Sequence, residues 1–554
     1  MSERSQVPEP TRSQSSPSSV GAVTNLRPER PVNTAIVDLA ALTGTRIEWV
    51  GAKPETGEGS VTVTGIDLRA QAILAGDLFA ALPGARVHGA RFVSEAVSQG
   101  ARAVLTDDAG FELVKQTGVD VEVPFLLHEN PRALLGAVSA TIYGHPTEKM
   151  TVIGITGTSG KTTTSYLVEA AIAAGGHTPG LVGTIETRIK GNRVPSALTT
   201  PEAPQLHALF AVMLEQGIDT AVMEVSSHAL ALGRVDGVRF AIGAFTNLSQ
   251  DHLDFHRDFE DYFAAKARLF DGDSPVRARK AVVCVDDEWG RRMAGIARDA
   301  GAEVVTVATT PVEPSQPAQP ADWRAKGGSL DTTGMQSFDL VDPAGCSSVV
   351  KLRLPGDYNV ANASLAVAVA EAAGVPEADA IGALASVDVP GRVQRVDRGQ
   401  DFLAVVDYAH KPAALGAVIG TLRGQSSGRL AVVVGAGGDR DKAKRELMGA
   451  VSARGSELLI VTDDNPRTED PVTIRDAVRG GAEDVPVEER GEIREVADRA
   501  AAIAAAVEWA HPGDVVLVAG KGHETGQEVD GVKHPFDDRE VLADAIDRRI
   551  GGGK

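Results

Sequence analysis

The sequence predicts an α/β protein of three domains, each built on a mainly parallel sheet. Short, almost continuously apolar runs alternate with stretches of helical length, which is typical of parallel strands covered by helices on both faces. The chain has 554 residues, and a domain usually takes about 100–200, so three or four domains fit. Hydrophobic residues make up 43% of the chain, which is enough for several cores.

Composition along the chain divides it into four segments. Residues 1–30 are rich in Ser, Pro, Arg and Glu, and we expect a disordered tail there. Residues 31–147 are expected to form a small α/β domain, and residues 148–390 a central domain with a mainly parallel sheet. Residues 391–554 are expected to form a Rossmann-like α/β domain, with a hinge at Pro390–Gly391.

The apolar runs give the expected strands. They are 76–82, 101–106 and 123–127 in the first domain, 151–156, 221–225, 241–247, 281–285 and 304–307 in the central domain, and 403–406, 430–435, 458–462 and 515–519 in the third. A proline-rich run at 311–322 is expected to be a surface loop. Because loops at the carboxyl ends of parallel strands build the sites of open α/β sheets, we expect functional residues directly after these runs.

Charge and cysteine content limit the possible functions. The net charge of −20 argues against a nucleic-acid-binding surface. The sequence has no run of about 18 apolar residues, so we expect no membrane span, and its first residues lack the apolar centre of a secretory signal. The two cysteines, Cys284 and Cys346, cannot form a disulfide framework. We expect a cytoplasmic protein, and a monomer.

A phosphate-binding loop is the strongest local motif. It comprises Gly157, Thr158, Ser159, Gly160, Lys161, Thr162 and Thr163, which follow the strand at 151–156 and open an apolar helix. Backbone N–H groups and the helix N-terminus would face the phosphates. Lys161 would reach the β- and γ-phosphates, and the Thr162 hydroxyl would bind Mg²⁺. The spacing is a shorter GxxGK variant, since Ile155 stands where the usual loop has its first glycine.

Two polar clusters follow other strands of the central domain. Glu224 comes at the end of one strand, where a carboxylate can hold Mg²⁺. The second cluster runs from Asn247 to His256, and its two histidines, His252 and His256, could share a helix face. Because Leu253 follows His252, the H-E-x-x-H pattern of a zinc protease is absent, and a Mg²⁺ site is the better interpretation.

The order of the motifs resembles the Mur ligases, a family of ATP-dependent, amide-bond-forming enzymes of peptidoglycan synthesis. The motifs are GTSGKTT at 157–163, EVSSHAL at 224–230, NLSQDHLDFH at 247–256, YFAAKARLF at 262–270, Gly391-Arg392 and DYAHKP at 407–412. The resemblance covers about residues 35 to 550. It implies a uridine-nucleotide domain, a central ATPase domain with a P-loop, and a C-terminal domain that binds an amino acid.

The resemblance also implies residue roles. It implies ATP contacts from residues 157–163 with Asn247, Arg392 and Asp407, and two Mg²⁺ ions held by Thr162, Glu224, His252 and Lys266. Lys161, His252 and Lys266 would be catalytic, Lys266 as a lysine carbamylated by CO2 (N6-carboxylysine). Thr199, Thr200, Ser226 and Arg234 would hold the UDP-N-acetylmuramoyl-dipeptide.

Two late segments indicate the amino acid. DNPR at 464–467 and GKGHE at 520–524 resemble the family members that add meso-2,6-diaminopimelate. The resemblance implies a pocket made by Arg440, Asp464, Asn465, Pro466, Arg467, Gly520 and Glu524. Diaminopimelate differs from L-lysine by one distal carboxylate, which an arginine can bind through two parallel hydrogen bonds. Asp-Asn-Pro is also ordinary turn chemistry, so the motif alone leaves both interpretations open.

The implied reaction is addition of meso-diaminopimelate to the D-glutamate γ-carboxylate of UDP-N-acetylmuramoyl-L-Ala-D-Glu through an acyl phosphate. Alternatives are an L-lysine-adding ligase of the same family and a ligase similar to folylpolyglutamate synthase, which should lack the first domain. A nucleotide-driven binding or motor module would not explain Lys266. A dehydrogenase using the glycines at 435–438 is disfavoured, because Arg440 stands where its third glycine should be.

Overall fold

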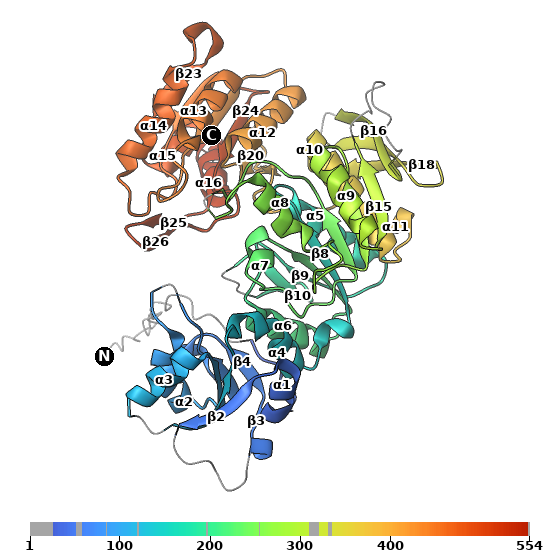
Figure 1. Ribbon diagram of the computed structural model, residues 1–554. Coiled ribbons are helices and arrows are strands. Elements are labelled where there is room, and N and C mark those ends of the chain that lie inside the picture. The colour runs from blue at the N-terminus through green and yellow to red at the C-terminus, as the bar shows by residue number, and fades with distance from the viewer. Residues whose placement is uncertain are drawn as a thin grey trace, which may run out of the picture.

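The computed structural model describes residues 26–50, 58–84, 86–118, 121–194, 198–253, 255–309, 321–330 and 335–551. These residues form three α/β domains in chain order, from the N-terminal domain (blue in Figure 1) to the C-terminal one (red). Each domain has its own mainly parallel sheet, which confirms the predicted fold class. No helix within these ranges is long and apolar enough to cross a membrane.

The first domain has a five-stranded sheet. Its strand order is β2 (Arg46–Val50), β7 (Val121–Leu127), β6 (Ala103–Thr106), β5 (Asp77–Ala80) and β4 (Gly65–Asp67), and only β2 runs antiparallel to its neighbour. The helices are α1 (Ile36–Thr43), α2 (Val93–Ser98), α3 (Asp108–Gln116) and α4 (Pro131–Ile142), and β1 (Thr34–Ala35) pairs with β3 (Thr62–Val63).

The central domain has an eleven-stranded sheet. Its parallel part is β9 (Pro179–Val182), β12 (Thr220–Glu224), β8 (Thr151–Thr156), β13 (Ile242–Phe245), β14 (Lys280–Cys284), β15 (Glu303–Ala308) and β16 (Trp323–Leu330). Antiparallel strands extend both edges: β10 (Thr187–Ile189) and β11 (Asn192–Val194) at one, β17 (Gln336–Val341) and β18 (Ser347–Leu352) at the other.

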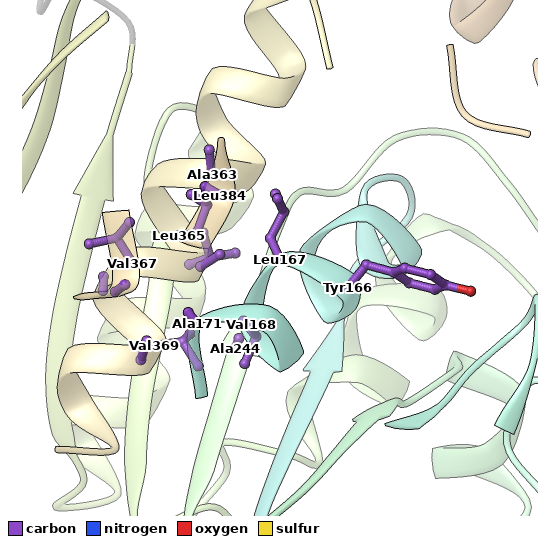
Figure 2. Close-up of a cluster of buried hydrophobic side chains, with 14 of the residues drawn as sticks. Tyr166, Leu167, Val168, Ala171, Ala244, Ala363, Leu365, Val367, Val369 and Leu384 are labelled. Atoms are coloured by element: carbon purple, nitrogen blue, oxygen red, sulfur yellow. The ribbon is translucent and has the colours of Figure 1, made fainter. Parts of the chain in front are cut away.

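Helices cover both faces of this central sheet. One face carries α5 (Lys161–Ala174), α10 (Asp357–Ala372) and α11 (Glu377–Leu384), and the other carries α6 (Ala203–Glu215), α7 (Ser227–Ala231), α8 (Phe259–Ala267) and α9 (Glu288–Asp299). Figure 2 shows α5 packing against α10 through Leu167, Val168 and Ala171. The helix that follows the phosphate-binding loop is therefore fixed by a buried core.

The third domain has a six-stranded sheet. Its order is β19 (Gln394–Arg395), β20 (Leu403–Asp407), β24 (Val515–Ala519), β21 (Leu430–Val434), β22 (Leu458–Val461) and β23 (Glu492–Glu495), with only β19 antiparallel. The helices are α12 (Pro412–Gln425), α13 (Lys444–Gly455), α14 (Pro471–Glu483), α15 (Arg499–Trp509) and α16 (Asp538–Gly551), and β25 (Gly526–Val529) with β26 (Val532–Pro535) forms a hairpin.

The first and central domains share one hydrophobic cluster. Ala203, Ala208 and Ala211 of α6, in the central domain, are buried together with Leu135 and Val138 of α4, in the first. The third domain has clusters made of its own residues only. The first two domains are thus joined by a continuous core. The third domain shares no hydrophobic cluster with either of them among the described residues.

The expected tail differs from the structure at its end. Residues 1–25 lie outside the described residues, but residues 26–30 bind both neighbouring domains. Arg27 donates to Asp77 in the first domain at 2.9 Å. The N–H groups of Glu29 and Arg30 donate to the Glu215 carboxylate, in the central domain, at 2.8 Å each. The prediction of disorder is wrong for these five residues, because their backbone and charges have partners.

Candidate active site

The phosphate-binding loop turns between β8 and α5. Gly157 has φ +147° and Gly160 has φ +88°, and both values favour glycine. Neighbouring groups also leave no room there: a Cβ on Gly157 would lie 1.9 Å from the Thr246 hydroxyl, and one on Gly160 would lie 2.3 Å from Asn362 Oδ1. Asn247 holds the loop from the end of β13, since its Oδ1 accepts from Ser159 N at 3.1 Å.

Lys161 is directed back over this loop. Its ammonium donates to the carbonyl oxygens of Gly157 at 2.9 Å and Thr158 at 3.0 Å. Burial lowers the pKa of Lys161 to about 8, an effect that Glu224 opposes and Lys411 reinforces. The amine therefore sits where a phosphate bound to the loop N–H groups would stabilise its charged form and raise its pKa again.

A hydroxyl and a carboxylate meet beside the loop. The Thr162 hydroxyl donates to Glu224 Oε2 at 3.0 Å, and Glu224 is 1% exposed. Thr184, which the sequence analysis missed, donates to the same carboxylate through its N–H at 2.8 Å and its hydroxyl at 3.0 Å. The donor set of hydroxyl and carboxylate oxygens fits a hard cation such as Mg²⁺.

Residues predicted to hold the muramoyl-dipeptide lie next to this carboxylate. The Thr199 hydroxyl lies 3.1 Å from the Thr184 hydroxyl. Thr200 donates to the Glu224 carbonyl at 2.9 Å, and Ser226 caps the N-terminus of α7 by accepting from Ala229 N. Arg234 lies 2.8 Å from Glu202. The structure brings Thr199, Thr200 and Ser226 together around Glu224, while Arg234 pairs with an acid at the start of α6.

His252 and His256 lie in a loop before α8, so the expectation of a shared helix face is wrong. His252 has φ +54°, a left-handed conformation that an α-helix cannot contain. Burial lowers the pKa of His252 to about 4, with Asp251 opposing that shift, so the imidazole is neutral near pH 7 and able to bind a metal. His256 is buried instead between α7 and α8, 3.0 Å from Ser227 Oγ and 3.2 Å from Asp261 Oδ2.

Lys266 is a buried amine beside the phosphate-binding loop. It is 1% exposed, donates to the Gly157 carbonyl at 2.9 Å and lies 4.3 Å from the centre of the Tyr262 ring. Burial is the main cause that holds the pKa of Lys266 well below its usual value, and the positive charge of nearby Lys161 is the second. Among the described residues, no carboxylate forms an ion pair with it.

The third domain reaches this region through two segments. Lys411, just before α12, forms an ion pair with Asp251 in the loop that carries His252. Arg392 stacks over the Tyr408 ring at 4.6 Å. Both oxygens of Asp407 accept backbone N–H groups, from Val393 and Ala409, at 2.7 Å each. Asp251 and Lys411 were not among the predicted site residues, because pairing across domains leaves no local pattern in the sequence.

Several of the residues predicted to bind the amino acid meet at the carboxyl edge of the third sheet, and this cluster is called the predicted pocket below. Asn465, after β22, donates to Glu524, after β24, at 2.8 Å. Gly520 has φ +117°, and a Cβ there would lie 2.7 Å from Asp464 Oδ2. The loops of Asp464 and Glu524 are also tied together by Arg499, a buried residue whose guanidinium donates to the carbonyl oxygens of Asp463 and Ala519.

Arg467 lies at the rim of this pocket. It follows Pro466 in a left-handed conformation with φ +53°, and its Nη1 donates to the Gly438 carbonyl at 2.5 Å. Its Nε lies 3.4 Å from Glu528 Oε2. Arg440 is exposed on the loop after β21. Sequence reasoning missed Lys521, at the centre of this pocket, although the GKGHE segment contains it.

Three family models match this chain. The model of the Mur ligase middle domain matches residues 155–370, that of the Mur ligase glutamate ligase domain residues 391–522, and that of the Mur ligase family catalytic domain residues 62–143. The chain belongs to the Mur ligase family, whose members are ATP-dependent ligases.

Its relatives include ligases named for 2,6-diaminopimelate. It is 52% identical to the UDP-N-acetylmuramoyl-L-alanyl-D-glutamate–2,6-diaminopimelate ligase of Corynebacterium glutamicum, over 90% of this chain and 94% of that one. It is 50% identical to the ligase of the same name from Streptomyces coelicolor, over 95% and 99%. A solved structure of a ligase with this name is 30% identical and has a TM-score of 0.64, covering 94% of this chain and 100% of that one.

A folate ligase is more distant. A solved structure of folylpolyglutamate synthase from Mycobacterium tuberculosis is 19% identical, with a TM-score of 0.55, and it covers 76% of this chain and 95% of that one. This likeness shows a common fold only. The folylpolyglutamate synthase alternative is therefore disfavoured relative to the diaminopimelate ligase.

Proposed function

We propose that this chain joins meso-diaminopimelate to the D-glutamate γ-carboxylate of UDP-N-acetylmuramoyl-L-Ala-D-Glu, with ATP as the energy source, in peptidoglycan synthesis. One observation supports this most directly. The predicted phosphate-binding loop, with its Thr162–Glu224 hydrogen bond, belongs to the central domain, and the Asn465–Glu524 pair, from the residues predicted to bind the amino acid, belongs to the third. The ion pair between Asp251 and Lys411 brings the two domains into contact. The enzyme would work in the cytoplasm, where ATP and the nucleotide-linked substrate are found.

The chemistry takes two steps. An oxygen of the γ-carboxylate attacks the γ-phosphorus of ATP, the bond to ADP breaks, and an acyl phosphate forms. The amine of diaminopimelate then attacks the acyl carbon, loses a proton and expels phosphate, which leaves an amide. In the first step two anions approach each other, so a positive environment is required. Lys161 and the N–H groups of the loop would provide it.

Residues for Mg²⁺ and for the carbamate fit the same step. Thr162, Glu224, His252 and Lys266 would hold the ions, which would neutralise charge on the reacting phosphate and carboxylate. Lys266 suits carbamylation because a neutral amine is the form that attacks CO2, giving a carbamate and releasing a proton. Its burial and low pKa favour that neutral form. The carbamate would turn an amine with no negative charge into an anionic oxygen ligand for Mg²⁺.

The test is phosphate release from ATP with UDP-N-acetylmuramoyl-L-Ala-D-Glu and either meso-diaminopimelate, L-lysine or no amino acid. We expect turnover with meso-diaminopimelate, and the tripeptide product by mass spectrometry. L-lysine should be used far less, since polar sites of this kind can discriminate by about 10⁴. Arg467→Ala should lose diaminopimelate ligation while keeping ATP binding. Equal use of L-lysine by the wild type would contradict the proposal.

A further inference from the structure

A buried lysine lies at the centre of the amino-acid pocket. Lys521 follows β24, and its side chain is 0% exposed. Its ammonium donates to Asn465 Oδ1 at 2.9 Å and to Glu524 Oε2 at 3.4 Å. It also lies 3.9 Å from Asp464 Oδ1. One cation therefore contacts three of the residues that were predicted to bind the amino acid.

These contacts fix the orientation of the Asn465 amide. Two donors converge on one terminal atom of that side chain: the Lys521 ammonium at 2.9 Å and the N–H of Glu528 at 3.0 Å. Because an ammonium and a backbone N–H can only donate, this atom must be the oxygen. The other terminal atom is then the NH2 group, which donates to Glu524 Oε2 at 2.8 Å. If the amide were flipped, its NH2 group would face the Lys521 ammonium and the Glu528 N–H, which are donors as well.

An NH2 group directed this way has a second hydrogen to donate. An amide nitrogen carries two donors, and Glu524 uses one of them. A donor at this position suits a carboxylate, which meso-diaminopimelate has at its distal carbon and L-lysine does not. The positive charge of Lys521 also offsets the carboxylates of Asp464 and Glu524, which would otherwise repel a carboxylate in the substrate.

We propose that Lys521 is a positioning residue that sets the preference for diaminopimelate over L-lysine, acting through the orientation of Asn465. The proposal rests on the proposed function, since it concerns selection at the same pocket. Lys521 need not touch the substrate, because its contacts are with Asn465, Asp464 and Glu524. Its loss should therefore weaken the use of diaminopimelate while leaving ATP binding intact, because none of its contacts among the described residues is with the phosphate-binding loop.

The experiment compares Lys521→Met, Lys521→Gln, Asn465→Ala and the double variant Lys521→Met with Asn465→Ala. The ratio of kcat/KM for meso-diaminopimelate to that for L-lysine is measured for each, together with the KM for ATP and the unfolding temperature. We expect the ratio to fall by about 10–100-fold in Lys521→Met, the range seen when a partner that orients a metal ligand is removed. Lys521→Gln, which keeps a donor but not the charge, should lose less.

The double variant separates positioning from general damage. If Lys521 acts through Asn465, its loss should change the ratio little once Asn465 is already alanine, so the two effects should not add. Independent structural damage would give additive effects. Lys351→Met, at an exposed lysine on β18 far from the pocket, is the matched control and should behave as the wild type.

The outcomes are distinct from those that test the function. If the wild type does not prefer meso-diaminopimelate, the proposed function fails before any variant is considered. If the wild type prefers it and either folded Lys521 variant keeps the full preference, the role of Lys521 is disproved. Additive effects in the double variant would disprove it as well. Should Lys521→Met fail to fold, Lys521→Gln decides the matter.

Discussion

The Lys161 ammonium has two carbonyl oxygens of its own loop as partners, and its pKa is about 8. A bound phosphate would raise that pKa toward its ordinary value of about 10.5. At about pH 7 the amine is charged both before and after ATP binds, so no proton is exchanged by this group. At about pH 9 it is mostly neutral beforehand and charged afterwards, so ATP binding should take up a proton.

Calorimetry of ATP binding in two buffers with different ionisation enthalpies measures this uptake. We expect proton uptake to grow between about pH 7 and pH 9, above the phosphate pKa of about 6. Lys161→Met should remove this dependence and lower the rate of ligation by about 10²–10³ or more. If a folded Lys161→Met protein took up as many protons on ATP binding as the wild type, Lys161 would not be the group that titrates.

Lys266 should carry CO2 in the active enzyme. Its neutral amine, buried beside Gly157, is the nucleophile that carbamate formation needs. Lys266→Ala should be nearly inactive, and added formate or acetate should restore part of the activity by supplying the missing carboxylate. The same acids should not rescue Lys161→Ala, which lacks a cation. Carbon-13 NMR of the enzyme with labelled bicarbonate would detect the carbamate, and full activity of Lys266→Ala would disprove its role.

At the scale of elements, the turn between β8 and α5 depends on Gly157. A Cβ there would lie 1.9 Å from the Thr246 hydroxyl, which holds the Ser159 carbonyl at 2.7 Å. Gly157→Ala should therefore push the end of β13 away and abolish nucleotide binding. Gly176, after the other end of α5, is the matched control: its φ is +84°, but a Cβ there would meet nothing within 4 Å.

Gly176→Ala should cost only backbone strain, about 1–2 kcal/mol, and keep nucleotide binding. Gly157→Ala should lower the free energy of unfolding by about 1 kcal/mol or more beyond this control. Denaturant unfolding and binding of a fluorescent ATP analogue measure the two effects. Equal behaviour of both variants would show that the close approach to Thr246 has no role.

The elements that the sequence predicts best are the buried parallel strands. The runs 151–156 and 515–519 coincide with β8 and β24, because both faces are covered and the apolar run is continuous. The antiparallel strands at the sheet edges escaped prediction. In β18, exposed and buried residues alternate, and the exposed β11 has little apolar character. Such short edge strands are defined by their partners rather than by their own composition.

Prediction of the site has a similar limit. Thr162, Glu224, Asn465 and Glu524 lie in motifs that follow strands, so their order along the chain indicated where they meet. Lys521 could not be recognised as buried, since lysine is usually a surface residue.

At the scale of the whole molecule, the contact between Asp251 and Lys411 joins two domains that share no core. A partly exposed pair of this kind contributes about 0.2–1 kcal/mol and weakens with salt. Lys411→Ala should therefore shift the molecule toward more open arrangements. Small-angle scattering should give a larger radius of gyration for the variant, and the wild type should approach that value at high salt.

Arg398→Ala is the control for this measurement. It removes an ion pair with Asp547, which lies within the third domain, and it should leave the radius of gyration unchanged. An equal change in both variants would mean that the pair between domains does not set their arrangement. Ligation needs the third domain close to the central one, so Lys411→Ala should also lower turnover.

The cluster in which α6 is buried with α4 determines how the protein melts. Two bodies that share a core cannot unfold separately, because unfolding of either one exposes apolar surface of the other. The first and central domains should therefore form one cooperative unit, and the third domain, with its own clusters, a second. Differential scanning calorimetry should resolve two transitions for three domains, and a fragment that ends between α4 and α6 would leave Leu135 and Val138 without their cover.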